Sequence, residues 1–271
     1  MPELPEVETT RRGIEPHALD QGIAALVIRE PRLRWPVPSD LPDKLQGLRL
    51  LAVRRRGKYL LLDTAKGTLI LHLGMSGSLR VCDSAEPPRK HDHLDLVLTH
   101  GRCLRFHDPR RFGCLLWTEA DPSAHPLLAP LGPEPLESDF TGAYLHRKAG
   151  SRGVAVKAFI MDSRVVVGVG NIYASEALFL AGILPARAAG RVSLADYERL
   201  AGSIRAVLTD SIAQGGTTLR DFVNESGKPG YFQQTLRVYG REGEPCRACG
   251  GAIRMERQGQ RATYWCPVCQ G

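Results

Sequence analysis

The sequence has no long hydrophobic run. No apolar stretch approaches the ~20 residues that a membrane-spanning helix requires. The first residues are acidic, whereas a secretory signal begins with a basic segment followed by an apolar one. We therefore expect no membrane association and a cytoplasmic location. The chain has 271 residues, 43% hydrophobic and 24% charged, which is an ordinary globular composition and enough for two domains.

The seven cysteines lack the pattern of a disulfide framework, because three of them are scattered and odd in number. A reducing compartment is the simplest account. The other four form two Cys-x2-Cys pairs separated by sixteen residues, which is the spacing of a four-cysteine zinc site. Because four thiolates complete the coordination shell, we expect one structural Zn²⁺. Its predicted ligands are Cys246, Cys249, Cys266 and Cys269.

Between the two cysteine pairs, residues 252–257 and 261–265 flank Gln258-Gly259-Gln260 and predict a hairpin with a glycine turn. The zinc would hold this hairpin, which is too small to fold alone. Arg261 would then lie on a rigid arm beside the tip. From spacing alone, an ordinary surface arginine is the favoured interpretation of Arg261.

A complete dinucleotide-binding fingerprint is also missing. Residues 167–171 contain a glycine pair before a predicted helix at 172–181, but the third glycine position is occupied by Tyr173. A tight turn at a helix N-terminus can still present backbone N–H groups to a phosphate, including a DNA phosphate.

The positive charge is unevenly distributed. Lys and Arg number 36 against 29 acidic residues, a net charge of +7, and residues 29–58 contain nine basic and three acidic side chains. Clustered positive charge indicates a polyanionic partner, most often nucleic acid. A solvated basic face without a partner is about equally compatible with charge alone.

The pattern of elements predicts an α+β protein. A helix over residues 3–18 is followed by short alternating or apolar runs typical of a sandwich or barrel. Five prolines in residues 122–135 indicate a domain boundary. Helices follow, one capped by Ser138-Asp139 and a longer one capped by Ser193 and ended by Gly215-Gly216. The predicted strands are residues 22–29, 48–54, 59–63, 68–73, 78–81, 93–99, 102–106 and 114–118, with 93–99 and 102–106 paired as a hairpin.

The N-terminus carries a candidate nucleophile. Aminopeptidase normally removes a Met that precedes a small residue, which would leave Pro2 with a free secondary amine. An α-amino group titrates near ~7.7–8.0, so a useful fraction is neutral at physiological pH. Its attack on a sugar carbon gives an iminium, and Glu3 could supply or accept the proton. From these residues alone, a plain lead into the first helix is the favoured interpretation.

Six separated motifs occur in order along the chain. They are Pro-Glu-Leu-Pro-Glu-Val-Glu at the start, His-Leu-Gly-Met-Ser-Gly at 72–77, Asp-Pro-Arg-Arg-Phe-Gly at 108–113, Gly-Val-Gly-Asn-Ile-Tyr at 168–173, Gly-Lys-Pro-Gly at 227–230 and the four-cysteine finger. Together they closely resemble the formamidopyrimidine-DNA glycosylase family, a bacterial enzyme family that removes 8-oxoguanine and ring-opened purines. The resemblance runs essentially end to end.

The resemblance implies an N-terminal β-sandwich with flanking helices (residues 1–121), a linker (122–136), a helix-two-turn-helix domain (137–230) and a zinc finger (237–271). It implies a monomer acting on double-stranded DNA that contains oxidised purines or abasic sites. Pro2 would attack C1′ of the damaged nucleotide and Glu3 would donate a proton. Lys58 would assist β-elimination, and Arg261 would assist δ-elimination and grip phosphate. A solvated cation is the alternative for Lys58.

Such an enzyme takes the damaged base out of the stack, so other side chains must fill the gap. By resemblance, Met75 and Phe112 form the wedge and Arg110 faces the orphaned cytosine. Both apolar side chains follow strands in glycine-flanked turns, which favours protrusion over burial in the core. The remaining DNA contacts implied by the family are His72, His91, Arg152 and Asn171.

Several other residues carry further alternatives. His91-Asp92-His93 could suggest a metal, although the family pattern assigns none there. Lys157 matches a lysine near the family's lesion site, and a plain position on an amphipathic helix is the alternative. Arg152 and Arg220 stand where we associate lysines with the family, which preserves charge but not geometry.

Two rival functions fit parts of the same pattern. A sister family resembling endonuclease VIII removes oxidised pyrimidines with the same terminal proline, but Leu4 and the pair Arg110 and Phe112 favour the purine enzyme. A non-catalytic zinc-finger protein that senses bent or damaged DNA would keep the basic cleft, the wedge and the finger, yet would not need a free Pro2.

Overall fold

The computed structural model describes residues 2–216 and 236–271. The chain divides into two compact units, Met1–Ala129 with Gln214–Tyr231 and Pro130–Ala213 with Phe232–Gly271. Arg220 and the predicted motif at 227–230 lie outside the described residues. The division into residues 1–121, 122–136, 137–230 and 237–271 stays a prediction.

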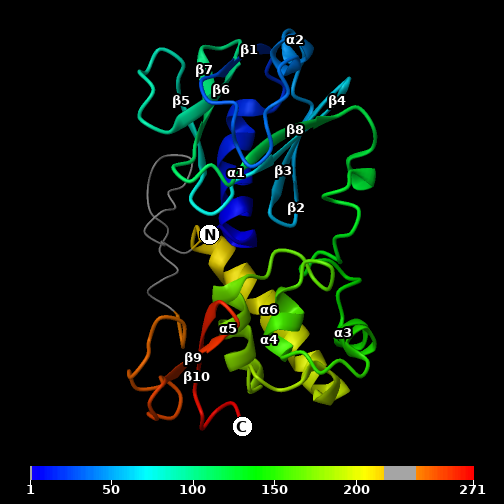
Figure 1. Cartoon of the computed structure of the whole chain (residues 1–271), viewed down its shortest axis with the longest axis vertical. Helices are drawn as coiled ribbons and strands as arrows, with labels where there is room; N and C mark the ends of the chain where they lie inside the picture. Colours follow the sequence, from blue (N-terminus) through cyan, green and yellow to red (C-terminus); the bar gives the residue numbers. More distant parts are fainter. Residues whose placement is uncertain (1, 217–235) are drawn as a thin grey trace. The chain divides into compact units, whose positions relative to one another are not determined.

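The first unit is a sandwich of two four-stranded antiparallel sheets (Figure 1). One sheet has the order β1-β6-β7-β5, and the other has the order β2-β3-β4-β8. Helix α1 (Leu4–Ala18) lies against strands of both sheets, and α2 (Leu41–Leu45) packs on β1. The strands are β1 (Ile23–Ile28), β2 (Ala52–Arg56), β3 (Tyr59–Thr64), β4 (Gly67–His72), β5 (Ser78–Asp83), β6 (Asp92–Leu98), β7 (Arg102–His107) and β8 (Cys114–Thr118).

The core of this unit lies between the sheets, because alternate strand residues point to opposite faces. Leu60, Leu71 and Leu104 from three strands belong to one buried cluster with Val7 and Ile14 of α1. The predicted pairing of residues 93–99 with 102–106 is confirmed, since β6 and β7 are antiparallel neighbours. Helix α1 and strand β8 also agree with their predictions.

The strand predicted over residues 48–54 is two segments. Residues 48–50 hydrogen-bond to the chain entering β1, through Ile23 N–H to Leu48 O (2.7 Å) and Leu50 N–H to Gln21 O (2.9 Å). From Ala52 onward the chain instead pairs with β3 in the other sheet. The apolar run is therefore continuous in sequence but crosses from one sheet to the other.

The second unit is helical. A 3-10 turn, Pro122–Ala124, precedes it in the chain, and a second one, Ala189–Arg191, lies within it. Helix α3 is capped by Thr141, whose Oγ1 accepts from Tyr144 N–H (3.0 Å), so the predicted cap at Ser138-Asp139 is wrong. Ser193 does accept from Asp196 N–H at the start of α6, as predicted. The helices are α3 (Gly142–Ala149), α4 (Val156–Met161), α5 (Asn171–Ala181) and α6 (Leu194–Ala213).

The C-terminal hairpin, β9 (Arg254–Gln258) and β10 (Arg261–Trp265), packs beside α5 (Figure 1). The fully buried carboxylate of Glu176 on α5 accepts three backbone N–H groups, those of residues 237–239, at 2.8–2.9 Å. Gln270 donates to Ile183 O (3.0 Å). The finger is thereby fixed to the helical unit at both of its ends. Within the described residues, no helix is long and apolar enough to cross a membrane.

Candidate DNA-binding and catalytic site

Pro2 and Glu3 lead directly into α1. Glu3 is the N-cap and forms a capping box with Glu6, in which Glu6 Oε2 accepts Glu3 N–H at 2.8 Å. Pro5 lies in the first turn, where its missing N–H costs no hydrogen bond. Glu3 and Glu6 are both buried. The peptide that follows the candidate nucleophile is therefore held rigidly at the helix start.

Lys58 lies in the tight turn between β2 and β3. Arg56 pairs with Tyr59, so Gly57 and Lys58 form a two-residue hairpin loop. Gly57 has a positive φ of +56°, whereas Lys58 does not have a positive φ. This combination is typical of a type II′ turn. The turn therefore requires the glycine that precedes Lys58.

His72 ends β4 opposite Tyr59, with the two ring centroids 4.8 Å apart. Burial, together with the nearby charges of Lys58 and Arg34, lowers the pKa of His72 to about 4. Its Nδ1 accepts Gly74 N–H at 2.9 Å, so the proton of the neutral ring is on Nε2. His72 thus lies near Lys58 and also fixes the turn that carries Met75.

The loops at 72–77 and 108–113 are joined through Asp108, which is fully buried. Its carboxylate accepts Ser76 Oγ–H (3.1 Å) from the first loop and Gly113 N–H (2.8 Å) from its own loop. The backbones also touch, since a Cβ on Gly74 would stand 2.4 Å from Gly113 N. The two loops therefore form one frame.

Met75 and Phe112 protrude from this frame, with 38% and 43% of their surfaces exposed. The prediction that they leave the core is confirmed. The Arg110 guanidinium carbon stands 4.9 Å from the centre of the Phe112 ring, within cation–π range. An exposed thioether, ring and guanidinium on a rigid frame suit insertion into a DNA helix.

His91 lies beside the same frame, because its carbonyl accepts Asp108 N–H at 3.0 Å. Its φ of +73° is unusual for a residue with a side chain. The other two side chains of the triplet form hydrogen bonds with other residues. His93 Nε2 pairs with Asp108 O, and the Asp92 carboxylate accepts from Arg80 and His107. Among the described residues, only the four cysteines form a cluster of metal-ligating side chains. The triplet does not form a metal site.

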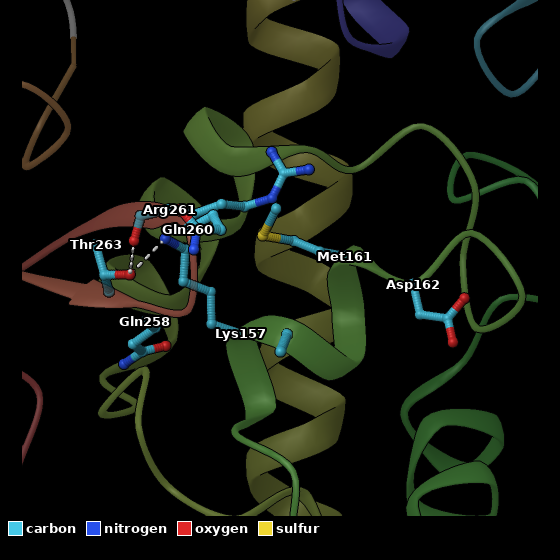
Figure 2. Close-up of a pocket in the computed structure, with 8 residues that line it drawn as sticks. Lys157, Met161, Asp162, Gln258, Gln260, Arg261 and Thr263 are labelled. Carbon is cyan, nitrogen blue, oxygen red and sulfur yellow. Dashed lines mark hydrogen bonds between the residues drawn. The ribbon is translucent and has the colours of Figure 1, made fainter.

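In the second unit, Arg261 extends from the hairpin toward α4 beside a cavity of about 300 Å³ (Figure 2). Lys157 on α4 is buried and donates to Thr263 Oγ1 (2.8 Å) and Ala262 O (3.1 Å). It therefore clamps the strand that begins with Arg261. The sequence suggested a residue near the lesion or an amphipathic helix, and gave no signal for this clamp.

Asn171, the first residue of α5, supports the same strand. Its Nδ2 donates to Ala262 O (3.0 Å) and Tyr239 Oη (3.4 Å). Arg152 is exposed, with its guanidinium carbon 5.9 Å from the centre of the ring of Phe159 on α4. The fold therefore brings Asn171 to the residue that follows Arg261, and it places Arg152 beside α4.

The four cysteines meet the geometric requirement of zinc. Their Sγ atoms all lie within 4.8 Å of one another, with Cys249 and Cys266 at 3.4 Å and Cys246 and Cys269 at 3.9 Å. Tetrahedral coordination with Zn–S bonds of ~2.3 Å places sulfurs about 3.8 Å apart. The donor set therefore fits one structural Zn²⁺. None of the seven cysteines, all in the described part of the chain, forms a disulfide.

Three family models match successive parts of the chain. They are the formamidopyrimidine-DNA glycosylase N-terminal domain (residues 1–115), the formamidopyrimidine-DNA glycosylase H2TH domain (131–223) and a zinc finger found in FPG and IleRS (243–271). The formamidopyrimidine-DNA glycosylase of Methylococcus capsulatus is 68% identical over 270 residues, covering 100% of both chains.

Solved structures of the same family are also similar to this chain. The MutM (Fpg) protein of Thermus thermophilus has a TM-score of 0.89 and 40% identity, covering 100% of this chain and 99% of its own. Lactococcus lactis Fpg in complex with DNA containing an abasic site has a TM-score of 0.90 and 33% identity, covering 99% of each chain.

The sandwich, the H2TH domain and the four-cysteine finger together define a DNA glycosylase of base excision repair. Enzymes of this class also cleave the DNA strand at abasic sites. The chain belongs to the formamidopyrimidine-DNA glycosylase family. Neither the pyrimidine-specific sister family nor a non-catalytic sensor is favoured by these matches.

Proposed function

We propose that this enzyme excises oxidised purines, namely 8-oxoguanine and formamidopyrimidines, from double-stranded DNA and then cleaves the strand by β,δ-elimination. The observation that carries the proposal is the 68% identity over the whole chain to a formamidopyrimidine-DNA glycosylase. A Lactococcus lactis Fpg variant has also been solved in complex with DNA containing Fapy-dG.

Pro2, freed of Met1, supplies the nucleophile. Its neutral amine bonds to C1′ of the damaged nucleotide as the N-glycosyl bond breaks and the base leaves. The amine proton is then lost, and the C1′–O4′ bond of the sugar opens as Glu3 donates a proton to O4′, which gives an iminium. The iminium is an electron sink, so loss of a C2′ proton expels the 3′ phosphate. Lys58 assists this β-elimination, and Arg261 assists the δ-elimination while gripping a phosphate. The capping box supports this role by fixing the Glu3 peptide.

Met75, Phe112 and Arg110 fill the space that the extruded base leaves, as their exposure on a rigid frame supports. His72, His91, Arg152 and Asn171 make further DNA contacts. His72 would act as a neutral hydrogen-bonding group, because burial lowers its pKa to about 4.

Zn²⁺ held by the four cysteines would stabilise the finger, and the chain's own residues would then present Arg261 to DNA. Lys157, which is buried, and Asn171, which is partly exposed, orient the strand that carries it. The protein acts as a monomer where its substrate lies, on the chromosome in the bacterial cytoplasm.

One additional glycine between Met1 and Pro2 tests the nucleophile. We expect this variant to lose strand cleavage on a duplex containing 8-oxoguanine while retaining binding to the lesion, because the proline nitrogen becomes an amide. In the unmodified enzyme, borohydride should trap a covalent adduct that maps to Pro2. A matched control carries the additional glycine after Gly271 and should remain active. Unchanged cleavage in the first variant, or an adduct at another residue, would refute the assignment.

A further inference from the structure

The carboxylate of Glu8 on α1 forms ion pairs with three arginines. Arg11 Nη2, Arg12 Nε and Arg55 Nε lie 3.0, 2.8 and 3.1 Å from its carboxylate oxygens. Burial raises the pKa of Glu8, but hydrogen bonds from Arg11 and Arg12 and the neighbouring charges outweigh it and hold that pKa below its usual value. The carboxylate is therefore a charged anchor at neutral pH.

Arg55 connects this anchor to the turn that contains Lys58. Its Nε donates to Glu8, and its Nη1 donates to Gly57 O at 3.0 Å. The side chains of Arg55 and Glu8 are each only 11% exposed. A planar guanidinium can make both bonds at once with fixed geometry, which a lysine ammonium cannot reproduce.

The other two arginines that bond Glu8 do not contact the turn at Gly57 in the same way. Arg11 Nη1 donates to Val53 O (3.2 Å) and so ties α1 to the body of β2. Arg12 bonds Glu8 from a side chain that is 58% exposed. Arg12 therefore shares the anchor of Arg55 while lying mostly in solvent, which makes it a matched control.

We propose that Arg55 is a positioning residue for Lys58, holding the turn at Gly57 in register with the helix that starts after Pro2 and Glu3. The proposal rests on the proposed function, in which Lys58 assists β-elimination. Arg55 acts through the backbone: it fixes the carbonyl of the residue that precedes Lys58. The anchor on α1 and the start of that helix belong to one rigid element.

The test uses full-length, zinc-loaded enzyme and a duplex with a preformed abasic site. Single-turnover strand cleavage is measured alongside borohydride trapping. In Arg55→Gln we expect trapping at the normal rate and cleavage slowed roughly 10- to 100-fold, the scale expected when a catalytic group is misplaced by about 1 Å. Arg55→Lys, which keeps the charge beside Glu8, should also be slow. Arg12→Gln should cleave normally.

A double-mutant cycle with Lys58→Ala separates the possible failures. If Arg55 works through Lys58, adding Arg55→Gln to Lys58→Ala should slow cleavage no further. Additive losses, or normal cleavage in Arg55→Lys, would overturn the positioning role. Normal cleavage in Lys58→Ala would instead overturn the function proposed for Lys58. If Arg55→Gln fails to fold, the same cycle is run with Arg55→Lys.

Discussion

His72 should make the stability of the first unit depend on pH in a narrow window. Burial lowers its pKa from 6.5 to about 4, with smaller effects from the positive charges of Lys58 and Arg34. Above pH 6.5 the ring is neutral in both the folded and the unfolded chain, so the proton linkage at His72 takes nothing from the free energy of unfolding. As the pH falls from 6.5 to 4, the unfolded chain binds a proton that the folded ring does not.

The size of the effect follows from the shift. A difference of about 2.5 pKa units corresponds to about 3 kcal/mol at most. At pH 5 the part already lost, relative to pH 7.5, is about 2 kcal/mol by the same linkage relation. Protonation of Nδ1 would also remove the acceptor for Gly74 N–H.

The assay is urea unfolding at pH 7.5 and pH 5, followed by the fluorescence of Trp35 and Trp117 in a Trp265→Phe background. The free energy of unfolding should differ between the two pH values by about 2 kcal/mol less in His72→Gln than in the unmodified protein. His100→Gln, at an exposed position of the same unit, should keep the full difference. Parallel losses in His72→Gln and the unmodified protein, or an NMR titration of the His72 ring near 6.5, would refute the reasoning.

Two further predictions concern the second unit. Cys249→Ser should lose zinc and DNA affinity together, because a structural zinc site contributes its binding energy to folding; metal-free protein that binds DNA normally would contradict the role given to the finger. Lys157→Met should keep the zinc but weaken the docking of residues 262–263 by about 1.5–3 kcal/mol, the range for hydrogen bonds to charged groups. Hydrogen exchange at those two residues should accelerate, and unchanged exchange would argue against the clamp.

Local patterns predicted the elements whose signals are local. Residues 114–118 are a short apolar run and form β8 with those bounds, and the Cys-x2-Cys pairs predicted the cluster that the structure shows. The glycine-flanked turns predicted that Met75 and Phe112 would protrude. The strand and the turns depend on neighbours within a few residues, and the cysteines follow a fixed spacing over 24 residues, so one sequence was sufficient.

The features that were missed depend on partners far along the chain. Lys157 on the short helix α4 bonds a strand about a hundred residues later, a partner that no local pattern indicates. Thr141 caps α3 because of where the backbone turns, although Ser138-Asp139 was an equally good local candidate. The role of Asp108 could not be foreseen either, since its partners come from two loops.

The frame built on Asp108 separates two kinds of evolutionary constraint. Its geometry is set by a buried carboxylate and by backbone contacts at Gly74 and Gly113, where any larger side chain would collide. Met75 and Phe112 only project from it. Selection can therefore exchange the projecting side chains while the scaffold beneath them tolerates almost no variation.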